Sequence, residues 1–303
     1  MMKSVLFGLP AIAVALTPAL ATAKDDDVLR LAPSMPWSVD YGEQSCGARR
    51  TFGTDDRKVY LELRQYSPGG EFVTTLASDD FRRRSRINRM AVTYLPDTEP
   101  DRDFDPILID TEGFGEGLMF NTTLLNADQR ARLIALGEGA DPSQVVNAEI
   151  MDAREAAVEG IALDDLFTED VVLETGSLKP VMTVMRDCLD GLVTYWGFDP
   201  EQQRNLSEPV KPRGIEEWAR ELQRRYPGTQ LRKGAQAYVR VRMNVDAAGG
   251  PTACAVQSDF NDTTFNTLAC NLLMEHARFE PARDAQGNAV ASFWTTAIRY
   301  KIA

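Results

Sequence analysis

Residues 237–250 read AYVRVRMNVDAAGG, and the spacing of their apolar side chains decides the fold of the C-terminal part of the chain. Every odd-numbered residue from Ala237 to Val245 is apolar, and the residues between them are polar or tyrosine. This period of two predicts a β-strand with one buried side and one solvent-facing side. The glycine-containing segment that follows predicts a tight turn, and residues 252–257 are the expected hairpin partner.

Two helices and a last strand are predicted around this hairpin. Residues 215–226 have apolar side chains on one helical face, and Pro227-Gly228 predicts the end of that helix. Residues 265–273 carry a second apolar helical stripe, and the alternation over 290–302 predicts a final strand. The predicted order in 214–303 is helix, strand, strand, helix, strand, which is an α+β arrangement with an antiparallel sheet.

The motifs of this region resemble those of a known family. Tyr226-Pro227, the strand and turn described above, and Arg278-Phe-Glu-Pro-Ala282 before the last strand occur in the order found in the C-terminal domain of TonB. The resemblance covers the C-terminal third of the chain. It implies an α-β-β-α-β domain that grips outer-membrane transporters in the periplasm of Gram-negative bacteria.

The resemblance also implies a partner-binding site. In the family, the last strand takes up an extended transporter peptide, the TonB box, by β-augmentation, and the Tyr-Pro pair lies near the transporter plug. Carried over to this chain, the partner-binding residues are Tyr226, Pro227, Ser292, Trp294, Thr296, Ile298 and Tyr300. An exposed edge strand offers unpaired N–H and C=O groups to such a peptide. The residues alone leave open that Trp294, Ile298 and Tyr300 instead pack the core of the domain.

Residues 24–198 predict a separate β-rich α+β domain of unknown type. Strand-like patches separated by Gly, Pro and Asp lie near 37–41, 59–63, 72–76, 90–95, 107–109, 118–120 and 171–173. One helix is predicted at 127–136. A longer one is predicted at 178–196, with an apolar stripe, Ser177 as N-cap and Gly197 just after its end. Residues 199–213 contain three prolines and almost no apolar side chain, which predicts a linker.

The first 23 residues have the pattern of a secretory signal peptide. Lys3 precedes a mostly apolar run that ends in Ala21-Thr22-Ala23. We therefore expect cleavage after Ala23 and export to the periplasm. A retained inner-membrane anchor is the alternative, although Pro10 and Pro18 interrupt the run.

Four cysteines in an exported chain predict two disulfides. Cys254 lies on the second strand of the hairpin and Cys270 on the following helix, so a bond between them is stereochemically reasonable. A similar pair occurs in a subset of TonB-like proteins. Cys46 and Cys188 then pair by elimination, and each bond is expected to contribute about 3–4 kcal/mol.

The composition excludes several classes of protein. The 303 residues are 44% hydrophobic and 26% charged, which indicates a globular chain long enough for two domains. A net charge of -12 argues against nucleic-acid binding. With a single histidine, His276, and no C-x-x-C spacing, we expect no enzyme activity, metal or cofactor. The basic cluster at 82–89 is either a solvated face or a docking site for lipid A phosphates, peptidoglycan carboxylates or an acidic partner.

Two functions follow from these predictions. The first is a TonB-like periplasmic protein that binds an outer-membrane TonB-dependent transporter by strand addition and supports energised uptake. The chain lacks the long spacer of the family, and a cleaved terminus could not engage the ExbB–ExbD motor, so we do not expect coupling to that motor. The alternative is a soluble periplasmic structural or interaction protein that reuses the module without motor coupling. A homodimer through the same edge strand is compatible with both.

Overall fold

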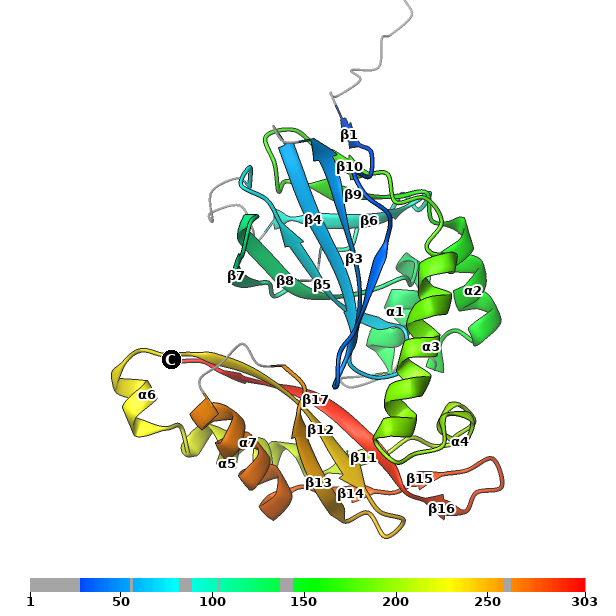
Figure 1. Cartoon of the computed structure of the whole chain (residues 1–303). Coiled ribbons are helices and arrows are strands. Elements are labelled where there is room, and N and C mark those ends of the chain that lie inside the picture. Colours follow the sequence, from blue (N-terminus) through cyan, green and yellow to red (C-terminus); the bar gives the residue numbers. More distant parts are fainter. Residues whose placement is uncertain are drawn as a thin grey trace, which may run out of the picture.

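The computed structural model describes residues 28–54, 57–81, 89–102, 104–136, 144–258 and 263–302 (Figure 1). The predicted signal peptide and residues 82–88 of the basic cluster lie outside the described residues. Among the described residues, no helix has both the length and the apolar character needed to cross a membrane. The chain is α+β, as predicted.

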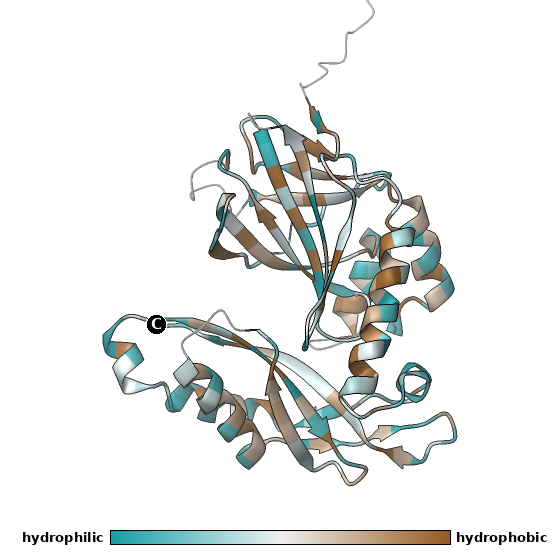
Figure 2. Cartoon of the chain, in the orientation of Figure 1, coloured by the Kyte–Doolittle hydropathy of each residue, from teal (hydrophilic) through white to brown (hydrophobic). Residues whose placement is uncertain are grey.

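A six-stranded antiparallel sheet is the largest element of the N-terminal region, with the strand order β2-β3-β4-β5-β8-β7. Apolar residues of β4 alternate with polar ones, and its Val59, Leu61 and Leu63 are fully buried. Figure 2 shows this alternation as brown and teal bands along the strands. The strands are β2 (Ser38–Tyr41), β3 (Cys46–Thr54), β4 (Arg57–Gln65), β5 (Glu71–Ala77), β7 (Ile107–Thr111) and β8 (Gly115–Thr123).

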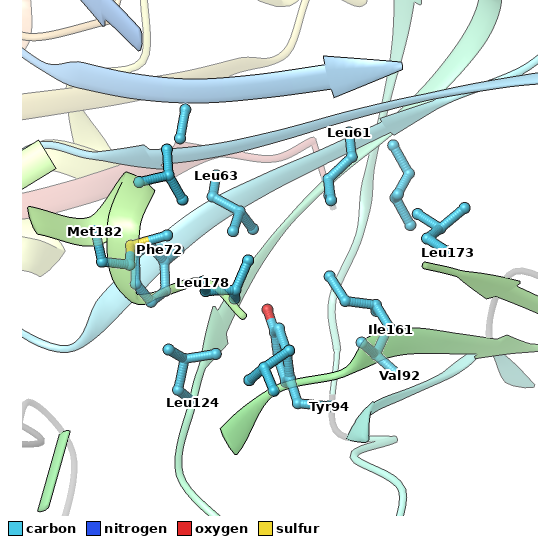
Figure 3. Packing of buried hydrophobic residues seen from close by; sticks show 14 of the residues in the cluster. Leu61, Leu63, Phe72, Val92, Tyr94, Leu124, Ile161, Leu173, Leu178 and Met182 are labelled. Atoms are coloured by element: carbon cyan, nitrogen blue, oxygen red, sulfur yellow. The ribbon is translucent and has the colours of Figure 1, made fainter. Parts of the chain in front are cut away.

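A smaller four-stranded sheet lies across the first, with the order β1-β10-β9-β6. Its strands are β1 (Leu29–Leu31), β6 (Ala91–Leu95), β9 (Gly160–Asp164) and β10 (Val171–Leu173), and only the β1–β10 pair is parallel. Figure 3 shows Leu61 and Leu63 of the large sheet facing Val92, Ile161 and Leu173 of the small one. The N-terminal core therefore lies between the two sheets.

Three helices, α1 (Ala127–Ala135), α2 (Ala148–Ala157) and α3 (Lys179–Tyr195), complete the N-terminal region. The predicted apolar stripe of α3 is buried in the core, and Cys188 on that stripe is bonded to Cys46 of β3. The expected N-cap is corrected: buried Leu178 occupies the cap position, and Ser177 Oγ accepts a hydrogen bond from the Lys179 N–H at 3.3 Å. The disulfide thus joins the longest helix to the large sheet.

The C-terminal region contains all five predicted elements. A three-stranded antiparallel sheet has the order β13-β12-β17, and α5 and α7 pack on one of its faces. The Cys254–Cys270 bond joins β13 to α7, as predicted. The elements are α5 (Ile215–Arg224), α6 (Gly228–Arg232), β12 (Ala237–Val245), β13 (Pro251–Val256), α7 (Thr263–His276), β14 (Arg278–Glu280), β15 (Ala282–Arg283), β16 (Ala289–Val290) and β17 (Ser292–Tyr300).

The connection at 199–213 is folded. It contains α4 (Pro200–Arg204), whose N-cap Asp199 accepts two backbone N–H groups, and β11 (Lys211–Arg213), which pairs with β14. Val210 is buried in the C-terminal hydrophobic cluster, while Arg204 forms an ion pair with Asp190 of α3. The few apolar and charged residues of this segment therefore fix it to both regions.

The predicted solvent-facing side of strand 237–245 is wrong. Arg240 and Arg242 on that side are only 8% and 6% exposed. The reason is that the N-terminal region covers this face of the sheet, with Gln257 Nε2 donating to the Tyr66 carbonyl at 2.7 Å across the contact. An alternating pattern of polar residues does not distinguish a face in water from a face in a polar interface.

Candidate functional site

The candidate site is the outer edge of β17. This strand pairs with β12 along its whole length, from Ser292 opposite Val245 to Tyr300 opposite Ala237. No strand among the described residues pairs with its other side. β17 is therefore an edge strand, as the resemblance implied.

A hydrogen bond on the β13 side of β12 and the register between β12 and β17 show which backbone groups point outward. The Gln257 N–H donates to the Arg240 carbonyl at 2.8 Å, so the even-numbered residues of β12 direct their backbone groups toward β13. The odd-numbered residues of β12 then bond to their partners in β17, which are even-numbered. The outward-facing backbone groups of β17 consequently belong to Phe293, Thr295, Ala297 and Arg299.

A hydrogen bond at the end of the strand agrees with this assignment. The backbone groups at the centre of the edge form no hydrogen bond within the described residues. Gln223 Nε2 of α5 donates to the Arg299 carbonyl at 3.2 Å from outside the sheet. Within the described parts of the chain, no hydrogen bond reaches the outward N–H or C=O groups of Thr295 and Ala297. Ala297 is also exposed. The edge therefore offers main-chain donors and acceptors to an added strand.

The predicted partner-binding residues of β17 direct their side chains toward one face of the sheet and not along its edge. Trp294 packs against Trp218 of α5 and Phe279 of β14, with ring centroids 5.9 and 5.4 Å away. Ile298 and Tyr300 are buried in the same cluster. Ser292, at the start of the strand, is 2% exposed, and Thr296 is half-buried. Their side chains share the face that α5 and α7 cover.

Tyr226 and Pro227 lie near the other end of β17. The Tyr226 ring packs against Tyr300 and Phe265, and its hydroxyl donates to the Ala235 carbonyl. Pro227 occupies the N-cap position of α6 and is half-buried. The structure thus brings Tyr226 and Tyr300 together, and Ser292 lies at the opposite end of the strand.

Sequence reasoning missed the four residues whose backbone faces outward, together with Gln223. The alternation of side chains locates a strand and its faces, but not the side on which its neighbour lies. An open hollow of about 680 Å³ lined by α5 also involves Gln223, together with Glu216, Ala219, Arg220 and Arg224. Gln223 therefore links this hollow to the end of the edge.

The chemistry of the site is that of main-chain recognition. Among the described residues, no group of three or more His, Cys, Asp or Glu side chains could hold a metal ion. Burial raises the pKa of Tyr300 to about 12, and neighbouring Tyr226 adds to the effect. Burial also lowers the pKa of Arg299 below its usual value. These shifts follow from packing of the domain.

Comparison with known families agrees with the fold of the C-terminal region. Residues 223–302 match the family model described as the Gram-negative bacterial TonB protein C-terminal. This part of the chain is similar to the C-terminal domain of TonB. The match runs from the end of α5 through β17, and the TonB-like domain therefore contains the whole candidate edge. A search of curated proteins finds no match to the sequence.

Removing the hydroxyl group of Tyr300, at the end of β17, and that of its neighbour Tyr226 is expected to change the free energy of unfolding in opposite directions. The Tyr300 hydroxyl is buried and has no hydrogen-bond partner among the described residues, so Tyr300→Phe is expected to raise the free energy of unfolding by about 1 kcal/mol. Tyr226→Phe removes the bond to Ala235 and is expected to lower it by about 1 kcal/mol. Urea unfolding of both variants measures these changes.

The same pair has an expected pH dependence. Because the pKa of Tyr300 is raised from 10.0 to about 12, the unfolded chain loses this proton first. Below pH 10 this proton is bound in both states and has no effect on the free energy of unfolding, which then falls as the pH rises from 10 toward 12. Tyr300→Phe should therefore flatten the alkaline fall in stability, and an unchanged slope would contradict the assignment.

Proposed function

We propose that the TonB-like domain binds an extended peptide of an outer-membrane TonB-dependent transporter by strand addition to β17, and so supports energised uptake. The observation that carries the proposal is the unpaired backbone of Thr295 and Ala297 on the edge of a domain that matches the TonB family. The peptide bonds with main-chain groups of the odd-numbered residues. The predicted partner-binding residues Trp294, Ile298 and Tyr300 then support the strand from its buried face, and Tyr226 with Pro227 forms a second contact.

A proline at the edge tests this proposal. The Ala297 N–H points away from β12, so Ala297→Pro removes no bond within the sheet but blocks pairing with an added strand. The full chain is titrated with a panel of labelled peptides that carry the TonB box of outer-membrane transporters, and binding is expected. Ala297→Pro should weaken this binding by at least about tenfold. Ala297→Ser keeps the N–H group and should bind as the unmodified chain does.

Either of two results would reject the proposal. If no peptide of the panel binds the unmodified chain, transporter binding is wrong. If peptides bind equally well to Ala297→Pro, another surface receives them.

A second function is favoured by the connection between the two regions. Residues 199–213 carry α4 and β11 and contact both regions, so they do not provide the long free spacer of the family. A periplasmic interaction protein that uses the module without motor coupling agrees with this observation. It predicts that deletion of the gene leaves siderophore and vitamin uptake unchanged, whereas the transporter function predicts a loss.

The cellular location and the domain division are part of the same proposal. Two disulfides support a periplasmic location, because such bonds persist in oxidising compartments. Separate hydrophobic clusters in the N-terminal and C-terminal regions support two domains joined at 199–213.

A further inference from the structure

The N-terminal region contacts the first end of β17 through aromatic rings. The Phe293 ring lies 5.2 Å from the Trp196 ring, edge to face, and 5.4 Å from the Phe198 ring, measured between centroids. Both partners follow directly from α3, and Phe293 packs against the N-terminal hydrophobic cluster. The strand is thus fixed at the residue where its free edge begins.

An acidic residue of the N-terminal region holds the other end. Asp105 forms ion pairs with Arg299 and with Lys301, whose Nζ lies 3.3 Å from the Asp105 carboxylate. Arg299 Nη2 also donates to the Asp105 main-chain carbonyl at 3.0 Å. Phe293 and Arg299 are the first and last of the four outward-facing residues, and we refer to these two sets of interactions as the end contacts.

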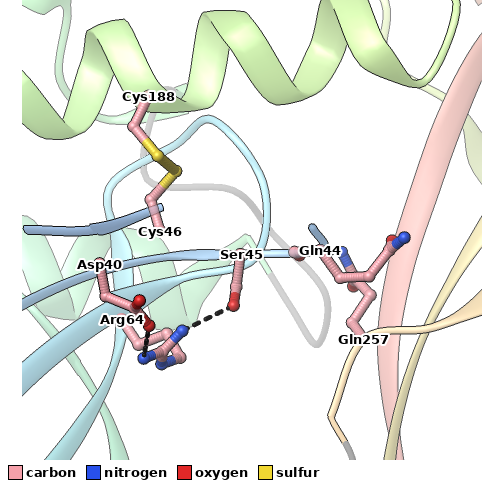
Figure 4. Close-up of a disulfide and its surroundings, with 7 residues drawn as sticks. All are labelled: Asp40, Gln44, Ser45, Cys46, Arg64, Cys188 and Gln257. Carbon is pink, nitrogen blue, oxygen red and sulfur yellow. Dashed lines mark hydrogen bonds and ion pairs between the residues drawn. A yellow bond between two sulfur atoms is a disulfide. The ribbon is translucent and has the colours of Figure 1, made fainter. Parts of the chain in front are cut away.

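Between the end contacts, the neighbouring strand β12 is also bound to the N-terminal region. The Arg242 guanidinium lies over the Trp196 ring at 4.0 Å, and its Nη1 donates to Gln44 Oε1 at 2.9 Å. The Arg240 guanidinium lies 4.8 Å from the Tyr66 ring. Figure 4 shows Gln44 and Gln257 side by side at this contact, next to the Cys46–Cys188 bond. The sheet is therefore fixed against a disulfide-bonded part of the N-terminal region.

We propose that the end contacts hold β17 in the extended form that receives a partner strand, which makes Trp196, Phe198 and Asp105 positioning residues of the strand-binding site. This inference rests on the proposed function. An edge strand is hydrogen-bonded on one side only. Without the end contacts, part of the binding free energy of a peptide would be used to order the strand, and the affinity would be lower. Arg299 lies six positions after Phe293, roughly 20 Å along a strand, so the partner is an extended peptide segment of about six residues.

Two variants of the N-terminal region test the end contacts without changing β17. Trp196→Ala removes the ring that Phe293 and Arg242 both contact, and Asp105→Ala removes the ion pairs at the other end. Both are expected to speed hydrogen exchange at the Trp294, Thr296 and Ile298 amides of the free full chain. Each should also weaken peptide binding by about tenfold.

Matched controls separate positioning from general destabilisation. Trp37→Ala removes an aromatic contact with Phe52 inside the N-terminal region, and Asp152→Ala removes ion pairs with Lys179 and Arg186 away from β17. Neither control is expected to change exchange in β17 or peptide affinity. Trp196→Phe retains a ring for Phe293 and should restore both. Because Asp105 is a surface residue with a 71% exposed side chain, its variant keeps the test valid if Trp196→Ala unfolds.

The outcomes distinguish this inference from the proposed function. If no peptide binds the unmodified chain, the proposed function fails, and exchange in β17 still tests the end contacts. If peptides bind and the two variants match their controls in both measurements, the positioning role of the N-terminal region is wrong.

Discussion

Replacing both Cys46 and Cys188 by alanine is expected to lower the free energy of unfolding by about 5 kcal/mol, more than the value of about 3–4 kcal/mol expected above for each disulfide, because loop-closure entropy grows with the length of the closed loop. The bond joins residues separated by 142 positions, so its loss releases a very long loop in the unfolded chain. It also removes the covalent link between β3 and α3, two elements of the N-terminal core. Urea unfolding followed by circular dichroism measures the change.

The second disulfide provides the matched control. Cys254→Ala with Cys270→Ala also removes two sulfur atoms and one bond, but the sequence separation is 16. Loop-closure entropy then predicts a loss of about 3 kcal/mol. Equal losses of unfolding free energy for the two double variants would contradict the role of loop length. A larger loss for Cys254 with Cys270 would show the opposite order to the one expected.

Gly249→Ala is expected to lower the free energy of unfolding by about 2–4 kcal/mol. Gly249 has a φ of +86°, a conformation that side chains other than glycine rarely adopt, and a Cβ built there would lie 2.3 Å from the Phe279 carbonyl oxygen. The backbone of β14 would have to move away from the β12–β13 turn. Thermal and urea unfolding of the variant measure the loss.

Gly287→Ala isolates the part of this effect that comes from backbone conformation. Gly287 has a φ of +82°, and no atom lies within 4 Å of a Cβ built there. We expect a loss of about 1 kcal/mol at this position. If both variants lost the same free energy, the close approach of Gly249 to Phe279 would contribute nothing.

Elements with a strong local pattern were predictable from the sequence. The odd-numbered apolar residues of 237–245 predicted a strand that has those bounds in the structure, and the stripe of 178–196 predicted α3 to within one residue at each end. β3 was missed because CGARRTFGT contains two glycines and two arginines, which weaken any strand pattern. It is a strand because β2 and β4 pair with it on both sides.

The sequence by itself determined the strands and helices of the TonB-like domain and the pairing of its two cysteines, because side-chain periodicity and motif spacing are local properties of the chain. That β17 lies at the edge of its sheet was implied by the resemblance and is established by the strand order of the structure. Tertiary structure alone decided that Phe293, Thr295, Ala297 and Arg299 present the outward backbone, since this depends on the side of β17 that β12 occupies. It also decided that Arg240 and Arg242 are buried. Their environment is set by Gln44, Tyr66 and Trp196, distant in sequence, and no local pattern encodes a contact of that kind.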